Sequence, residues 1–179
     1  MQNVNHITLN LDFNEIYNLG VQYISESLQD MKNITQLTLN MCNNQISNGG
    51  AYHISLALQQ MKNITSLQLS LRSNLIEQQG IQYICQALGE MKYLTLLILD
   101  FNDNKISDEG ALHISKTLQK IKNVEYLTLD LAKKIEEKQQ KTFDNSGDSK
   151  IQNVKEKQHN QKMLIPSKKG KKNKSFKII

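Results

Sequence analysis

The stretch Met31–Gln60 reads MKNITQLTLNMCNNQISNGGAYHISLALQQ, and it decides the fold of this 179-residue chain because its pattern returns. Copies begin at Met61 and Met91, a weaker copy begins at Met1, and a fifth begins at Ile121 and stops after one predicted strand. The period is thirty residues without insertion or deletion. Such regularity is typical of solenoids, in which each unit packs against its neighbours.

The first half of each unit alternates between apolar and polar residues. In the second unit Leu37, Leu39 and Met41 are apolar, with Thr38 and Asn40 between them, and the third and fourth units repeat this order. Period two predicts a strand with one buried face. We expect strands near residues 7–11, 37–41, 67–71, 97–101 and 127–131.

The second half of each unit has helical spacing. Ala51, Ile54 and Leu58 lie three and four residues apart, which makes one face of a helix apolar. Ser47 and Ser107 precede helices, and a serine hydroxyl at that place can cap the first turn. We expect helices over about residues 18–29, 48–59, 78–89 and 108–119.

Each unit also carries an asparagine between strand and helix, followed by an isoleucine and a glycine at fixed distances. A side-chain amide there can satisfy backbone groups where the strand turns away. We therefore expect a structural ladder of these asparagines. They are Asn14, Asn44, Asn74 and Asn104.

This order resembles the leucine-rich repeat family, whose pattern is L-x-x-L-x-L-x-x-N-x-L. The I-x-x-x-G-A that follows is similar to the ribonuclease-inhibitor-like subclass. One departure is an additional L-x pair before the asparagine, which we interpret as a longer strand. The resemblance implies an α/β solenoid with parallel strands on a concave face and helices on a convex face. Spacing favours the same curvature, because paired strands lie about 4.8 Å apart and packed helices about 8–10 Å.

Charge divides the chain into two regions. Residues 1–132, the predicted array of four repeats plus a fifth strand, hold eight basic and twelve acidic residues, which gives a net charge of −4. Residues 133–179 hold fourteen lysines and five acids, a net charge of +9, and this lysine-rich tail is expected to be disordered. Its lysine run at 168–174 can contact nucleic acid or an anionic surface, or can serve only as a soluble end.

Targeting signals are absent from the sequence. No apolar run approaches membrane length, and the N-terminus lacks a signal-peptide pattern. Cys42 and Cys85 occupy different places in their units, so we expect free thiols. An intracellular, cytoplasmic protein is predicted, or a nuclear one if the lysine run is an address. Because no capping segment precedes the first unit, we read Met1 as the start of a fragment or of a tolerated polar edge.

Catalytic motifs are also absent, including G-x-S-x-G and G-x-x-x-x-G-K. His53 and His113 occupy equivalent places two units apart, roughly 16–20 Å at helix spacing, which is too far for one metal ion. We predict a protein that is not an enzyme and has no metal or cofactor.

The strand face that points away from the helices carries the informative variation between units. Leu96, Ile98 and Tyr126 interrupt its polar residues, and Arg72 is the sole arginine of the chain. Aromatic residues and arginine are enriched in binding hot spots. The alternative is a polar sheet with a few tolerated apolar residues. The predicted partner-binding residues are Gln68, Ser70, Arg72, Leu96, Ile98, Asp100, Tyr126 and Thr128.

Together these patterns predict a non-enzymatic module for protein–protein interaction, a scaffold or adaptor whose concave sheet binds a partner protein. The alternative is a regulatory segment of a signalling system. The resemblance implies two forms of it: a small-GTPase regulator, or a fragment of a larger protein that contains, for example, a kinase.

Overall fold

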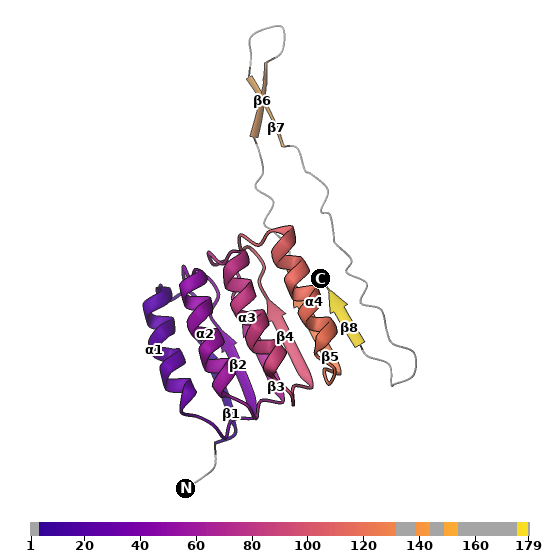
Figure 1. Ribbon diagram of the computed structural model, residues 1–179. Helices are drawn as coiled ribbons and strands as arrows, with labels where there is room; N and C mark the ends of the chain where they lie inside the picture. The colour runs from indigo at the N-terminus through magenta and orange to yellow at the C-terminus, as the bar shows by residue number, and fades with distance from the viewer. Residues whose placement is uncertain (1–3, 132–138, 144–148, 154–174, 179) are drawn as a thin grey trace.

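The computed structural model describes residues 4–131, 139–143, 149–153 and 175–178. Strands and helices alternate through the first of these ranges (Figure 1). The strands are β1 (His6–Asn10), β2 (Gln36–Asn40), β3 (Ser66–Ser70), β4 (Leu96–Asp100) and β5 (Tyr126–Asp130). The helices are α1 (Tyr17–Gln29), α2 (Asn48–Gln60), α3 (Gln78–Glu90) and α4 (Asp108–Lys120).

The strands form one parallel sheet in chain order, and the helices stack as one layer on a single side of it (Figure 1). Every array strand pairs with the next at an offset of thirty residues, so that Leu37 lies opposite Leu67 and Leu67 opposite Leu97. This arrangement confirms the predicted α/β solenoid. Each helix bound lies within one residue of its predicted position, and each strand begins one residue earlier than predicted.

The additional L-x pair does not lengthen the strands, so that expectation was wrong. Each array strand has five residues, and β2 ends before Met41. Met41 is nevertheless fully buried, and its N–H donates to the carbonyl oxygen of Ser70 at 2.9 Å. The extra apolar residue therefore fills the core one residue beyond the end of the strand, where a backbone hydrogen bond still joins it to the next unit.

The core runs without interruption through the array, because the strand leucines of each unit pack against its helix and against the next unit. Leu37 and Leu39 are 1% and 2% exposed. Their counterparts Ile7 and Leu9 are only partly buried, because no described unit lies on the outer side of β1. Stacking, more than the composition of a single unit, thus buries the apolar columns.

Beyond the array, the described residues form β6 (Gln139–Phe143), β7 (Ser149–Asn153) and β8 (Ser175–Ile178). Strands β6 and β7 pair antiparallel, and β8 pairs in parallel with β5. The prediction that residues 133–179 are disordered falls mostly on residues outside those described, and it stays a prediction.

The asparagines between strand and helix join neighbouring units by hydrogen bonds. The side chain of Asn74 is buried, and its Oδ1 accepts the N–H groups of Asn44 and Ile46 at 3.1 and 2.9 Å. Its Nδ2 donates to the carbonyl oxygens of Met41 and Leu71 at 2.9 and 2.8 Å. One amide thus satisfies backbone groups in two units at once.

Asn44 and Asn104 repeat these contacts in the units before and after. The Oδ1 of Asn44 accepts the N–H of Asn14 at 3.0 Å, and the Oδ1 of Asn104 accepts the N–H of Ile76 at 3.0 Å. Asn14 itself is exposed, and its Nδ2 donates to the carbonyl oxygen of Asp12.

A second set of asparagines joins the helix starts. The Oδ1 of Asn48, at the start of α2, accepts the N–H groups of Glu77 and Gly80 at 2.9 and 3.0 Å, and thereby caps α3. Asn18 caps α2 in the same way through Ser47 and Gly50. Anions and acceptors at this end also suit the helix dipole.

These cross-unit caps change the expectation that Ser47 caps its own helix. Asn48, at the start of α2, is half-buried and bonded to the next unit. The hydroxyl of Ser47 does not cap its own helix, whereas that of Ser107 accepts the N–H of Gly110 at 3.4 Å. The fourth helix uses its own serine because Gln78 stands at the place of the capping asparagine.

The same contacts explain why each unit has a glycine at this position. A Cβ built on Gly80 would lie 2.7 Å from Asn48 Oδ1, 2.8 Å from the Cγ2 of Ile76 and 3.1 Å from the Cβ of Ala51. Glycine is therefore required here by close approach of three side chains from two units.

We expect Asn74→Ala to lower the free energy of unfolding by about 1–3 kcal/mol or more, because it leaves buried backbone groups unsatisfied. Asn48→Ala removes a half-buried cap and should cost about 1 kcal/mol. Urea denaturation of both variants measures the difference. Equal urea midpoints would contradict the prediction that the buried ladder contributes more to stability than the half-buried helix cap.

We also expect Gly80→Ala to destabilise the array by about 1–3 kcal/mol, since its new methyl group must displace packed side chains. Gly89 is the matched control in the same helix, because a Cβ there meets nothing within 4 Å. Gly89→Ala should stabilise by up to about 0.5–1 kcal/mol through helix propensity. Thermal melts of the two variants should move in opposite directions, and a fall for both would count against the steric explanation.

Candidate protein-binding surface

The open sheet face is the side of the sheet that carries no helices, and alternate strand residues lie on it. Pairing arranges these residues in rows across β3, β4 and β5. The rows are Ser66–Leu96–Tyr126, Gln68–Ile98–Thr128 and Ser70–Asp100–Asp130. Seven of the eight predicted binding residues lie in these rows, and Arg72 follows β3 at its carboxyl end.

An apolar cluster, Leu96, Ile98 and Tyr126, occupies two adjacent rows of the open sheet face. Leu96 and Ile98 are half-buried, and 60% of Tyr126 is exposed. Leu96 and Tyr126 are direct neighbours in the β4–β5 pairing, which brings the aromatic ring beside an aliphatic side chain. The cluster therefore offers apolar area on rigid strands, the kind of support that fixes a binding site.

A polar chain of contacts lies at the carboxyl ends of the strands. The Oγ of Ser70 donates to Asp100 Oδ2 at 3.3 Å and lies 3.1 Å from the Sγ of Cys42. The other carboxylate oxygen of Asp100 accepts the N–H of Asn102 at 3.0 Å. Two of the predicted binding residues, Ser70 and Asp100, are thus held in place by their neighbours.

Cys42, the cysteine among these polar contacts, is not an activated nucleophile. Burial raises the pKa of the Cys42 thiol above its usual value, and the nearby carboxylates of Asp12 and Asp100 raise it further, while the Ser70 hydroxyl lowers it. A raised pKa keeps the sulfur protonated at neutral pH, and the thiolate is the reactive form. Cys42 can therefore contribute packing and hydrogen bonding to this surface.

The arginine on this surface has a partner that the sequence pattern did not indicate. Arg72 Nε lies 3.4 Å from Asp103 Oδ2, and that oxygen also accepts from the hydroxyl of Ser73 at 3.3 Å. The backbone of Asp103 has a φ of 55°, in the left-handed region that aspartate tolerates better than most residues. Because about half of the Arg72 side chain is exposed, the ion pair adds at most about 1 kcal/mol to the free energy of unfolding. The exposed part of the guanidinium group remains accessible to a partner.

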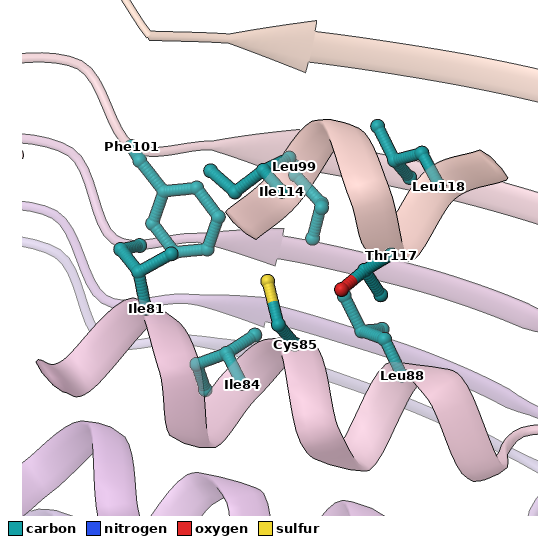
Figure 2. A pocket seen from close by; sticks show the side chains of 9 residues that line it. All are labelled: Ile81, Ile84, Cys85, Leu88, Leu99, Phe101, Ile114, Thr117 and Leu118. Carbon is teal, nitrogen blue, oxygen red and sulfur yellow. The ribbon is translucent and has the colours of Figure 1, made fainter. Parts of the chain in front are cut away.

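A seam between α3 and α4 is the other site to consider. Figure 2 shows the thiol of Cys85 directed between the two helices, below the side chains of Leu99 and Phe101. The seam has no room for a water molecule, and its wall is apolar except at Thr117 and Cys85. Burial raises the pKa of the Cys85 thiol, with an opposing contribution from Thr117. This seam is packed core.

Across the described ranges, no three His, Cys, Asp or Glu side chains converge as they would around a metal ion. His113, on the helix side, lies with its Nε2 3.0 Å from the Nε2 of Gln82. Within the same ranges no helix is both long and apolar enough to cross a membrane.

Comparison with known proteins bears on the fold. A family model described as "Leucine Rich repeat" matches residues 94–115, which contain β4 and the first turns of α4. No curated protein matches the chain.

Among solved structures, the chain is similar to "Leiomodin-1 Actin-Binding Site 2 (ABS2)", with a TM-score of 0.55 and 23% sequence identity. The likeness covers 74% of this chain and 71% of that one, and at this identity it is a likeness of fold. Together with the thirty-residue strand-and-helix units, these matches support a likeness to the leucine-rich repeat family, and the fold is an α/β solenoid of leucine-rich-repeat type.

Proposed function

We propose that the array is a non-enzymatic protein-interaction module, a scaffold or adaptor that binds a polypeptide partner on its open sheet face over β3, β4 and β5. The observation that carries this proposal is the apolar cluster of Leu96, Ile98 and Tyr126 on paired strands. Leucine-rich-repeat architecture supports it, because a curved stack of units presents one extended binding surface.

The cluster has the character of an interaction hot spot. Tyr126 presents a large ring with a polar hydroxyl, and such residues give much contact area with few rotatable bonds. Covering an exposed apolar side chain contributes up to roughly 1.5–3 kcal/mol. The rigid sheet below holds Leu96 and Ile98 in position, so little conformational freedom is lost when a partner binds.

The polar row beside the cluster would set partner choice. Asp100 is fixed by Ser70 and by the N–H of Asn102, and Arg72 is oriented by Asp103. Fixed charges beside an apolar patch act mainly on orientation and association rate. The surface thus suits a partner segment that places an apolar side chain over Ile98 and a polar or charged group toward Asp100.

The neighbour's title names actin binding, and actin is therefore a reasonable first protein to try as a partner. The ribonuclease-inhibitor-like subclass stays a prediction, as does a role as small-GTPase regulator or as a fragment of a larger, kinase-containing protein. Contact of the lysine run with nucleic acid or an anionic surface concerns residues outside the described ranges and stays a prediction, as does a cytoplasmic or nuclear location.

Ile98→Asp should reduce partner binding by about tenfold or more, because the carboxylate cannot be buried under an apolar contact. Capture with the full chain as bait, beginning with purified actin, measures the loss. The circular-dichroism melt should change little, since Ile98 is half-buried on the open face.

His113→Asp is the matched control on the helix side. It introduces the same charged side chain at a half-buried position and should leave capture intact. If the helix-side variant loses binding and Ile98→Asp retains it, the partner binds the convex face and the assignment of the open sheet face is wrong.

A further inference from the structure

The edge of the sheet at β5 is occupied by a strand from the far end of the chain. Figure 1 shows β8, at the C-terminal end, lying beside β5 and continuing the sheet beyond the array. The pairing is parallel, with Tyr126 opposite Ser175 and Leu129 opposite Ile178. Among the described residues no helix follows β5, so this sixth strand arrives without a repeat unit of its own.

The sequence of β8 copies the pattern of the array strands. Phe176 pairs with Leu127 and Ile178 with Leu129, so both apolar residues take register positions of the two buried leucine columns. Lys177 takes the register position opposite Thr128. The order polar-apolar-polar-apolar is the order of Ser66–Ser70 without its last residue. Four residues of the tail therefore imitate a repeat strand.

An unpaired β5 edge would be a liability. The edge of a sheet presents a row of unsatisfied N–H and C=O groups, which pair readily with other chains. A parallel strand can reach this edge only through a long connection, of about a dozen residues or more. The 43 residues from 132 to 174 exceed this length. The tail can therefore return to the edge where the array ends.

We propose that the β5 edge is a strand-docking site, which accepts in parallel a segment with apolar residues at two alternate positions, and that Ser175–Ile178 of the same chain is its occupant. This site uses the main-chain edge of β5, whereas the proposed partner surface uses side chains on the open sheet face, and strand docking does not depend on a partner there. Binding by strand addition uses main-chain hydrogen bonds for affinity and alternate side chains for selectivity.

The tethered occupant is replaceable. It is four residues long and no helix among the described residues accompanies it, so its pairing with β5 is short. Its advantage over a free segment is the tether, which gives an effective concentration of order millimolar for short flexible linkers and less for longer ones. A partner strand of the same pattern can bind once the tail strand is removed or outcompeted.

The test uses the full chain and a fluorescent peptide of residues 172–179, KNKSFKII. Phe176→Asp with Ile178→Asp in the chain should release the tail strand and open the edge. Fluorescence anisotropy should then give a Kd for the peptide that is about tenfold or more lower than for the wild-type chain, in which the tethered strand competes. A peptide carrying the same two substitutions should not bind.

Lys177→Ala is the matched control, because Lys177 takes the register position opposite Thr128 and not one in a leucine column. It should keep the edge closed. Hydrogen exchange at the β5 amides should be slow in the wild-type chain, faster in the double variant, and slow again with saturating peptide.

Equal peptide affinity for the wild-type chain and the double variant would overturn the proposal, as would no binding to either. Unchanged hydrogen exchange in β5 would also overturn it. A circular-dichroism melt shows that the double variant keeps the array folded. Capture through Ile98 should be unaffected, so a failure here is distinguishable from a failure of the proposed function.

Discussion

The buried amide of Asn74 is the contact on which the rest of the structure depends. It binds backbone groups of its own unit and of the preceding one, at a place where no strand continues to satisfy them. The ladder asparagine must therefore follow its strand at the same distance in every unit, as Asn44, Asn74 and Asn104 do. A one-residue insertion between strand and asparagine would move the amide away from its partners, and this explains a thirty-residue period without insertions.

Two sets of asparagines fix the two layers separately. The buried ladder sets the spacing at the strand ends, and Asn18 and Asn48 set the spacing at the helix starts. Gly50 and Gly80 let the capping side chains approach closely. The apolar cluster lies on β4 and β5, and the strand end of β4 is joined to the preceding unit by the ladder contacts of Asn104.

The alternation and helical spacing were enough to predict every array strand and helix, because the two periods differ and recur without drift. Side-chain direction followed too, since a strand places alternate residues on opposite faces. The cross-unit contacts were not predictable in the same way. Asn48 looks exposed when one unit is considered alone, and the pairing of Arg72 with Asp103 joins residues thirty-one positions apart that no strand pattern aligns. Strand β8, with four residues of which two are apolar, was too short to be predicted from the sequence pattern.

Contacts in the array join units that are neighbours, at separations close to one period. The ladder asparagine and the apolar strand positions recur at the junctions between the four units, whereas the helix cap of α4 comes from its own Ser107. A whole unit such as residues 61–90 carries the groups that contact the preceding unit and those that contact the following one. They include its apolar strand residues, its ladder asparagine and its glycine. Duplication or loss of such a block would leave the ladder and the apolar strand positions matched at every remaining junction. Length is therefore the property that this architecture can change most easily during evolution, whereas the thirty-residue block itself resists change.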